Sequence, residues 1–324
     1  MKLSVVTPTL RRPKEVGELL NCLAQTKVIP SELVLVDGAP EGEDDTARVV
    51  AGLAPEMPFE IRYLRSPKGT ALQRNRGIDQ AQGDFIAFID DDVRVAPDFF
   101  EVILKQFGRG EHRDVGGMVG VKTNLTFDGS KRARWRWYRR LGLLRTFEPG
   151  RYDFECGYPI NAAMQPPFEG VREVDFMTTA CAVWRREVFA QGLRFDLFFR
   201  NFGVLEDAHF SLRAGKQWRL LQCGDAQCRE LNASGGRGNA HLLGFKSVVN
   251  YYYVFRDIAG PLSLGQRFRF WRYQAFELCR MFASGIRRFR FDDFRNLTGR
   301  LHGAWHILTG FSSAKPFARE GEAP

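Results

Sequence analysis

The chain has 324 residues, of which 44% are hydrophobic and 26% are charged, a balance that is ordinary for a soluble globular protein of one large domain or two smaller ones. The sequence has no apolar run of the ~18 residues needed to cross a membrane, and its six cysteines show no paired C-x-x-C spacing. These features argue against a membrane-spanning protein and against a zinc cage. With no secretory signal, they predict reduced thiols and a cytoplasmic location.

The net charge of +9 is concentrated in two stretches of the sequence. Residues 130–147 contain seven lysines and arginines and no acidic residue, and residues 244–324 contain thirteen basic and six acidic residues. Because the rest of the chain is slightly acidic, these two basic patches favour an anionic partner over a general contribution to solubility.

Short apolar segments alternate with helical patterns in the first part of the chain. We predict strands at residues 3–6, 33–36, 61–64, 85–89 and 116–121, and helices at residues 15–25, 72–81 and 97–107. Thr7-Pro8-Thr9 is expected to end the first strand, because proline cannot continue a central ladder. The alternation of strand and helix predicts a doubly wound parallel sheet, in which ligands bind beyond the carboxyl ends of the strands.

Three consecutive carboxylates, Asp90, Asp91 and Asp92, follow the apolar strand at residues 85–89. Like charges this close together stay ionised only in water or beside a cation. Carboxylate oxygens on a short turn suit Mg²⁺ or Mn²⁺, especially when phosphate oxygens complete the coordination, and an acidic surface turn is the alternative. Asp37 closes a neighbouring strand and is expected at the same rim of the sheet, although it could simply form the turn before Gly38.

Four segments occur in an order and at a spacing that are typical of a known family. They are residues 4–13 (SVVTPTLRRP), 33–38 (LVLVDG), 74–78 (RNRGI) and 88–92 (FIDDD), and together they resemble the N-terminal half of a family 2 glycosyltransferase with the GT-A fold. The resemblance implies a site for a nucleoside diphosphate sugar. It also implies a divalent cation, Mn²⁺ or Mg²⁺.

The resemblance assigns roles to individual residues on the donor side. Pro8 and Thr9 would line the pocket of the nucleotide base, and Asp37 would accept a hydrogen bond from the base. Asp90 and Asp91 would approach the ribose and the phosphates.

The cation and the departing diphosphate need charged partners. On the same resemblance, Asp92 would ligate the cation, aided by Asp90 or Asp91. The guanidinium of Arg74 near the cation would neutralise the diphosphate and hold it through paired hydrogen bonds. A solvated helix face is the alternative for Arg74, and it is the interpretation that we favour for Arg76.

A second block is similar to the acceptor half of the same family. It comprises residues 174–189 (VDFMTTACAVWRREVF) and 205–215 (LEDAHFSLRAG), and in the family a Glu-Asp pair there opens a helix that faces the sugar. On this resemblance Asp207 is the general base, because inverting attack by a hydroxyl requires one base on the acceptor side. Helix capping by Glu206 and Asp207 is the alternative. Where the family often has a histidine that helps to hold the metal or phosphate, this chain offers Glu230 or His241.

Aromatic residues are interleaved with the basic ones in both patches. Residues 130–147 include Trp135, Trp137 and Tyr138, and could contact an anionic acceptor, a membrane surface or nucleic acid, or pack their aromatics inward as an amphipathic hairpin or helix. Near the C-terminus, an apolar stripe at helical spacing predicts helices that pack against the catalytic domain, with a membrane-surface or oligomer role as the alternative. The members of this stripe are Phe268, Trp271, Ala275, Leu278 and Phe282.

These patterns lead to one expected architecture. It is an α/β, GT-A-like, doubly wound and mostly parallel sheet flanked by helices, with a C-terminal helical extension. The catalytic domain is expected over residues 1–235, with a nucleotide-sugar half (1–100) and an acceptor half (101–235). A basic, aromatic-rich helical extension is expected over residues 236–324. At the boundary between the two, residues 235–238 (GGRG) predict a mobile loop, and residues 314–324 are expected to be disordered.

The expected function is that of an inverting, metal-dependent glycosyltransferase, which moves a sugar from a nucleoside diphosphate to a hydroxyl of a saccharide or lipid-linked acceptor. Peripheral contact with the inner face of a membrane and a homo-oligomer formed through the C-terminal helices are also expected options, whereas nucleic acid is not an expected partner. Two alternatives remain. One is a sugar nucleotidyltransferase, although the first strand is not followed by the glycine-rich triphosphate loop that such an enzyme needs. The other is a non-enzymatic membrane-surface or nucleic-acid binding protein that uses the basic, aromatic patches.

Overall fold

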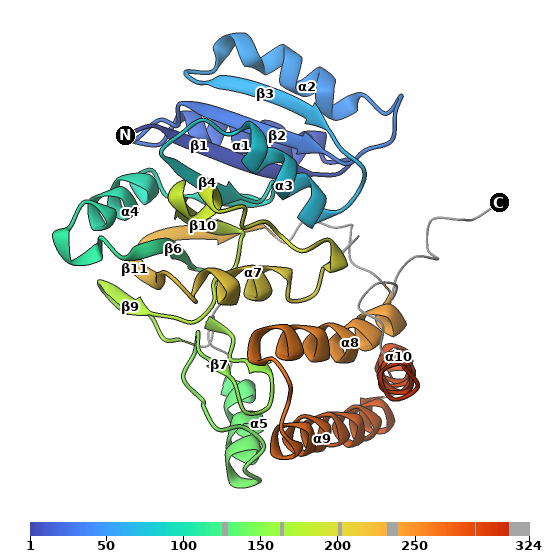
Figure 1. The fold of residues 1–324 in the computed structure, drawn as a ribbon. Helices are drawn as coiled ribbons and strands as arrows, with labels where there is room; N and C mark the ends of the chain where they lie inside the picture. The colour runs from blue at the N-terminus through green and yellow to red at the C-terminus, as the bar shows by residue number, and fades with distance from the viewer. Residues whose placement is uncertain (125–128, 163–164, 200–202, 232–238, 289, 311–324) are drawn as a thin grey trace.

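A nine-stranded sheet runs through the computed structural model, which describes residues 1–124, 129–162, 165–199, 203–231, 239–288 and 290–310 (Figure 1). The strand order along the main path is β3-β2-β1-β4-β10-β6-β11-β5, and β9 pairs with β11 outside this path. Helices cover the sheet, and three long C-terminal helices lie at one end of the molecule (Figure 1). This architecture confirms the expected α/β fold with a helical C-terminal region.

The first half of the sheet is parallel and regular. Its strands are β1 (Leu3–Thr9), β2 (Glu32–Asp37), β3 (Glu60–Arg65) and β4 (Phe85–Ile89), joined by helices α1 (Pro13–Ala24), α2 (Asp45–Leu53) and α3 (Thr70–Gln80). A short 3₁₀ turn (Ala54–Glu56) follows α2. Every residue of β1, β2 and β4 is buried. Because both faces of these strands are covered, their sequences read as continuous apolar runs, and the predicted strands are confirmed.

The first strand extends further than the sequence suggests. β1 continues through Pro8 to Thr9, so the prediction that Thr7-Pro8-Thr9 ends the strand is wrong. The carbonyl of Thr9 accepts a hydrogen bond from the Gly38 N–H, so Thr9 faces β2 and its neighbour Pro8 faces the opposite side. On that side β4 pairs with β1 only over residues 3–6. The missing N–H of Pro8 therefore removes no hydrogen bond from the ladder.

The second half of the sheet is mixed rather than parallel. β10 (Cys181–Arg185) runs antiparallel between β4 and β6 (Val115–Lys122), and β6 pairs in parallel with β11 (Arg219–Glu230). β11 also pairs antiparallel with β5 (Val93–Val95) and with β9 (Val171–Glu173). The long strand β11 was not predicted. A register shift between Gln222 and Gln227, next to Gly224, interrupts the alternation by which a strand is recognised.

Shorter elements complete this half. The helices are α4 (Phe99–Phe107), α5 (Gly129–Arg140), α6 (Glu187–Ala190) and α7 (Glu206–Ala214), with 3₁₀ turns at Gly110–His112 and Leu197–Phe199. A small hairpin is formed by β7 (Tyr152–Asp153) and β8 (Tyr158–Pro159). The basic stretch near residue 135 thus forms a helix that buries Trp135 and Tyr138 and exposes Trp137. Two of its three aromatic side chains pack inward, as expected for the alternative of an amphipathic helix.

The C-terminal region consists of α8 (Ala240–Ala259), α9 (Leu264–Arg288) and α10 (Phe291–Leu308). It is joined to the rest of the molecule by hydrogen bonds from α8: Asn250 to the carbonyl of Val204, and Tyr253 to the carboxylate of Asp196. No helix in the described parts of the chain is long and apolar enough to span a membrane. The proposed domain boundary at residue 235, the predicted loop at 235–238 and the predicted disordered tail at 314–324 lie outside the described residues.

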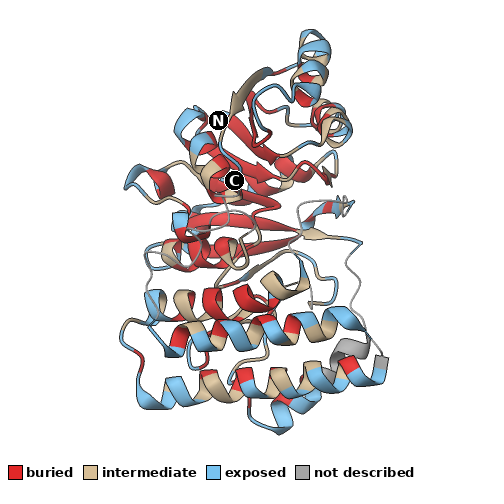
Figure 2. Cartoon of the chain, turned by 90° about the vertical axis from the view of Figure 1, so that its right-hand side faces the viewer, coloured by how far each residue is buried: buried red, intermediate tan, exposed pale blue. Residues whose placement is uncertain are grey.

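The apolar stripe of α9 does not form its packed face. Phe268 and Phe282 are 64% and 52% exposed, whereas Phe270, Tyr273 and Glu277 are buried. Helix α9 does pack inward, as predicted, and Trp271 of the stripe packs against a buried cluster, but Phe268 and Phe282 of the stripe do not belong to the packed face. Figure 2 shows the exposed outer sides of these helices at the end of the molecule far from α2. Aromatic residues occur on both faces of α9, so helical spacing alone did not show which face is buried.

Candidate active site

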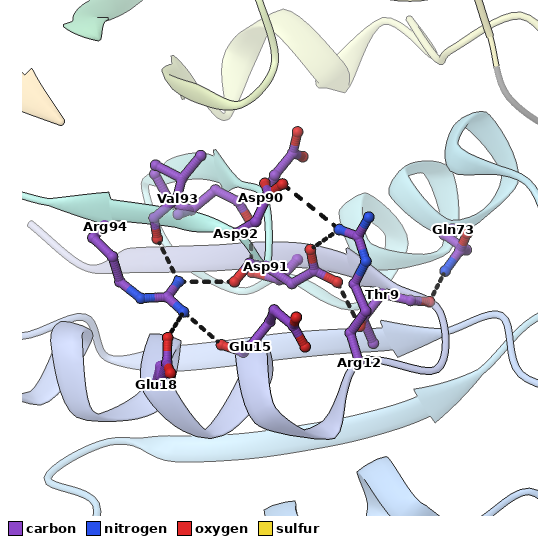
Figure 3. A network of polar contacts seen from close by, with 12 residues as sticks. Thr9, Arg12, Glu15, Glu18, Gln73, Asp90, Asp91, Asp92, Val93 and Arg94 are labelled. Carbon is purple, nitrogen blue, oxygen red and sulfur yellow. Dashed lines mark hydrogen bonds and ion pairs between the residues drawn. The ribbon is translucent and has the colours of Figure 1, made fainter. Parts of the chain in front are cut away.

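The acidic turn after β4 is built around a buried carboxylate, Asp91 (Figure 3). The Thr9 hydroxyl donates a hydrogen bond to Asp91 Oδ2 at 2.7 Å, and Arg12 Nη1 donates one to Asp91 Oδ1 at 2.6 Å. Burial raises the pKa of Asp91 to about 6, although Arg12 and Thr9 favour its charged form. Asp91 therefore ties the turn to the end of β1 and to the loop before α1.

Arg94 fixes the backbone of the same turn (Figure 3). Its Nη1 donates to the carbonyls of Asp91 and Val93 at 2.8 and 2.9 Å. Its Nη2 donates to the Glu15 carbonyl and the Glu18 carboxylate at 3.0 and 2.9 Å. The turn is thereby anchored to α1, so its carboxylates are held in a fixed arrangement before any ligand binds.

Arg74 connects the acidic turn to the start of α7. It is buried, its Nη2 donates to Asp90 Oδ1 at 3.0 Å, and its Nη1 forms a hydrogen-bonded ion pair with Glu206. The Thr70 hydroxyl donates to the other oxygen of Glu206 at 2.7 Å. The two predicted halves of the site therefore meet at one guanidinium. The alternative of a solvated helix face does not describe Arg74, whereas its neighbour Arg76 is exposed.

Asp207 follows Glu206 in the first turn of α7. Its Oδ1 accepts a hydrogen bond from the Ala208 N–H at 2.8 Å. Burial raises the pKa of Asp207, and the charges of Arg74 and Lys122 oppose this increase. A carboxylate in the first turn of a helix, held by a backbone hydrogen bond, is positioned to accept a proton from an acceptor hydroxyl.

The backbone before α7 is constrained. Leu205 has φ 71° and ψ 13°, a left-handed conformation that costs a non-glycine residue of order 1 kcal/mol. A side chain at Gly203 would collide with the Glu206 carboxylate. Both features fix the path of the backbone into α7. They therefore fix where the Glu206 and Asp207 carboxylates lie.

Asp37 and Thr9 lie opposite each other, because they end β2 and β1 in register. Asp37 is buried. Its Oδ1 accepts from the Ala39 N–H at 2.8 Å, and its Oδ2 accepts from the Tyr63 hydroxyl at 2.7 Å. The Gln73 amide donates to the carbonyls of Thr9 and Val36, both at 2.8 Å. The predicted base-binding residues Pro8, Thr9 and Asp37 are therefore brought to one edge of the sheet.

Glu230 and His241 occupy different surroundings. Glu230 pairs with Val93 across β11 and β5, next to the acidic turn, and its carboxylate accepts from Lys122 Nζ at 2.7 Å. The ring of His241 lies 5.7 Å from that of His302 on α10. Glu230 is thus the candidate that lies beside the acidic turn, and its role toward a metal remains a prediction.

The prediction that Asp90 and Asp92 hold a divalent cation rests on the chemistry of their carboxylate oxygens, which suit a cation shared with a substrate. In the described parts of the chain, no group of three or more His, Cys, Asp and Glu side chains is arranged to hold a metal ion alone. Mg²⁺ and similar hard cations are commonly bound by one or two carboxylates together with substrate phosphates. Each carboxylate of the turn has an arginine nearby, because Arg12 contacts Asp91 and lies 3.8 Å from Asp92 while Arg74 contacts Asp90. The assignment of the cation to Asp92 and Asp90 stays a prediction.

Sequence reasoning missed two contributors to this arrangement. Arg12 lies inside the quoted segment 4–13, but its pairing with Asp91, far along the chain, leaves no local pattern. Tyr63 lies inside β3, two residues before Arg65, which is the register partner of Asp37. Only the parallel pairing of β2 and β3 reveals that Tyr63 and Asp37 are neighbours.

Comparison with known proteins supports the resemblance to family 2 glycosyltransferases. The family model described as glycosyl transferase family 2 matches residues 4–192. The succinoglycan biosynthesis protein ExoM of Rhizobium meliloti is 39% identical over 161 residues, which are 48% of this chain and 49% of that protein. The uncharacterized glycosyltransferase YwdF of Bacillus subtilis is 32% identical over 220 residues, which are 68% of this chain and 70% of that protein. The match therefore spans about half of ExoM and more than two thirds of YwdF.

Solved structures share the fold. Residues 1–349 of Staphylococcus aureus TarS, in complex with UDP-GlcNAc, superimpose with a TM-score of 0.52 and 15% identity, covering 94% of this chain and 92% of that one. The mannosyltransferase PcManGT of Pyrobaculum calidifontis, in complex with GDP-Man and Mn²⁺, gives a TM-score of 0.55 and 15% identity, covering 94% and 87%. The extent of the family match and the identity to YwdF show that this chain belongs to glycosyl transferase family 2.

Proposed function

We propose that this chain is an inverting glycosyltransferase that uses a nucleoside diphosphate sugar and a divalent cation, and transfers one sugar to an acceptor hydroxyl. The observation that carries the proposal is the position of Arg74, which contacts both Asp90 of the acidic turn and Glu206 at the start of α7. A donor site and a general base on these two segments would share one cleft.

The acceptor side supplies the base. As the acceptor oxygen attacks the anomeric carbon, Asp207 accepts the hydroxyl proton, a bond forms between oxygen and carbon, and the bond from carbon to the diphosphate breaks. The nucleoside diphosphate leaves with the electron pair of that bond. Attack from the side opposite the leaving group inverts the anomeric configuration, so a single carboxylate base is sufficient.

The donor side neutralises the leaving group. A bound Mn²⁺ or Mg²⁺ would place positive charge on the diphosphate. Asp90 and Asp92 would hold that cation, and Arg74 orients Asp90 through the hydrogen bond at 3.0 Å. Pro8, Thr9 and Asp37 would receive the base at the adjoining strand ends. Asp91 supports this edge through Thr9 and Arg12.

The acceptor is proposed to be a saccharide or a lipid-linked saccharide. A relative from Campylobacter jejuni, GalNAc(5)-diNAcBac-PP-undecaprenol beta-1,3-glucosyltransferase, is 26% identical over 34% of this chain, and its name describes a lipid-linked acceptor. Such an acceptor would place the enzyme at the inner face of a membrane as a peripheral protein. Family membership favours transfer over the nucleotidyltransferase alternative.

A thermal-shift screen tests the donor site. We expect one nucleoside diphosphate, among those of uridine, guanosine, thymidine and cytidine, to raise the melting temperature in the presence of Mn²⁺ and to do so less without it. Asp90→Asn and Asp92→Asn should each reduce the Mn²⁺-dependent part. Asp84→Asn, at the opposite end of β4, should not, because Asp84 is exposed. A screen in which no nucleotide stabilises the wild-type protein would contradict the proposal.

A further inference from the structure

The outer side of α9 carries an apolar stripe that faces solvent. Leu264 and Phe268 are 84% and 64% exposed, and Phe282 and Ile286 are each 52% exposed. Ala275 and Cys279 are also exposed, and together these six residues recur at intervals of three, four or seven positions. That spacing places them on one side of a helix of 25 residues. Isolated exposed apolar residues are ordinary, but a continuous stripe of this length marks an interaction surface.

Helix α5 extends the surface sideways. The ring of Tyr138 lies 5.8 Å from that of Tyr273 and 5.3 Å from that of Phe276, so α5 packs beside α9 (Figure 1). The guanidinium of Arg272 donates to the Gly142 carbonyl and lies 6.0 Å from the Phe268 ring, which links the end of α5 to the stripe. We call the stripe of α9, together with exposed Trp137 of α5 and Leu141 directly after α5, the α5–α9 face; its residues are Trp137, Leu141, Leu264, Phe268, Ala275, Cys279, Phe282 and Ile286.

In the described parts of α5 and α9, the exposed charged side chains are all arginines, and the neighbouring carboxylate of Glu155 is already paired with Arg269. Exposed arginines flank the α5–α9 face, and none of them forms an ion pair with the described residues; they are Arg136, Arg139, Arg140, Arg267 and Arg287. The Arg140 guanidinium lies 5.6 Å from the Trp137 ring, which places cation and aromatic side by side. The acidic residue of α9, Glu277, is buried and paired with Arg280, so it does not offset these charges at the surface.

We propose that the α5–α9 face docks on an anionic phospholipid bilayer. A helix with aromatic and aliphatic residues on one side and arginines at its margins is suited to lie in the plane of a bilayer, with the apolar side chains among the acyl chains and the arginines at the phosphates. Anionic lipid adds electrostatic attraction for each arginine near the surface.

A second copy of this chain fits the surface less well than a bilayer. In a two-fold dimer the same patch would face itself. The arginines around the α5–α9 face would then lie against arginines, and the described residues place no exposed acidic side chain on α9 to compensate. Anionic lipid provides the complementary charge that a second copy lacks.

Vesicle flotation of the full chain tests the proposal, with phosphatidylcholine vesicles compared with vesicles that also contain phosphatidylglycerol. We expect binding to the anionic vesicles at low salt, weaker binding at high salt, and little binding to phosphatidylcholine alone. Arg267→Glu combined with Arg287→Glu should raise the lipid concentration for half-maximal binding by roughly tenfold or more. Phe268→Ser combined with Phe282→Ser should have an effect of similar size.

A matched control changes the same charge elsewhere. Arg48 lies on α2 and Arg109 in the loop after α4, both away from α9. The variant that combines Arg48→Glu with Arg109→Glu should bind vesicles like the wild type. Cys279 provides a second readout, because its side chain is exposed, whereas Cys22 is partly buried and the other four cysteines are buried. An environment-sensitive fluorophore on Cys279 should shift to shorter wavelength only with anionic vesicles.

The outcomes separate this proposal from the transfer chemistry. Asp207→Asn should bind anionic vesicles like the wild type, whatever its catalytic rate. Absence of flotation with anionic vesicles, or equal loss of binding in the Arg48/Arg109 control, would overturn the proposal. A dimer in solution that dissociates on Phe268→Ser/Phe282→Ser, in a protein that does not bind vesicles, would assign the face to self-association instead.

Discussion

The donor side and the acceptor side of the site are held by different kinds of contact. Thr9 and Asp37 end neighbouring parallel strands in register, and Asp91 follows β4 on the other side of β1, so the ladder itself brings these residues together. Helix α7 instead begins after a left-handed residue and is fixed by side chains from distant elements, among them Arg74 and Asn250. Substitutions on the donor side should therefore act mainly on ligand binding, and substitutions at α7 mainly on catalysis.

Of the substitutions that test this difference between the two sides, Asp207→Asn should have the largest effect, which is on the rate of transfer. An amide retains most of the shape of the carboxylate but accepts no proton, so transfer should fall by about 10²–10⁴-fold. Mn²⁺-dependent stabilisation by the nucleotide should persist, because the donor side is intact. Asp114→Asn changes an exposed aspartate directly before β6 and is the matched control. Transfer by Asp207→Asn at the wild-type rate would show that the base lies elsewhere.

Arg74→Met tests the connection between the two sides. It leaves Asp90 and Glu206 without their shared cation, and loss of one partner from a buried ion pair costs about 3–5 kcal/mol of unfolding free energy. Chemical denaturation measures this cost, and transfer should fall in the fraction that remains folded. Arg76→Met removes the same charge two residues away on the exposed side of α3 and should change neither quantity. Equal stability of the two variants would show that Arg74 does not bridge the site.

Arg12→Ala should have a smaller effect, confined to the donor side. It removes the arginine from the buried Asp91, which keeps the Thr9 hydroxyl, and also removes the longer ion pair to Asp92 at 3.8 Å; we expect a loss of about 3 kcal/mol of unfolding free energy. Arg11→Ala is the control, because the Arg11–Glu43 pair is exposed and should contribute little. Asp91→Asn in the Arg12→Ala background should restore part of the lost stability, since the unpaired charge is removed. No restoration would mean that Arg12 acts through packing instead.

The smallest expected effect is a shift in the midpoint of the acid limb when the rate of transfer is measured against pH. Asp207 must be ionised to accept a proton, and because burial raises its pKa, the inactive protonated form should persist to a higher pH than for an ordinary aspartate of pKa about 4. The acid limb of the rate profile, measured at saturating donor, should therefore have its midpoint above that value. The result that would contradict this expectation is a profile that stays flat down to the ordinary aspartate range.

The donor side was largely predictable from sequence. Its strands are buried on both faces, so they appear as uninterrupted apolar runs, and the polar residue after each run marks the rim at which ligands bind. Asp37 and the acidic turn were found in this way. Pro8 was misread as a strand end, because the sequence does not show on which side the neighbouring strand β4 stops.

The acceptor side was predictable only in outline. The Glu-Asp pair marked the start of α7, but its contact with Arg74 joins residues 132 positions apart and leaves no local pattern. The long strand β11 was hidden by a register shift, and the exposed face of α9 was assigned to the interior because both faces carry aromatic residues. Local periodicity identifies elements, whereas the partners of those elements are set by tertiary packing.

A crystal structure of the Asp207→Asn variant with its nucleotide sugar and Mn²⁺ would test the central claim most directly. The account predicts that the diphosphate lies at Asp90 and Asp92, with the base at the ends of β1 and β2, and that the anomeric carbon faces the side chain of residue 207. A donor bound elsewhere, or bound at the acidic turn with its sugar directed away from α7, would contradict the claim that these two segments form one active site.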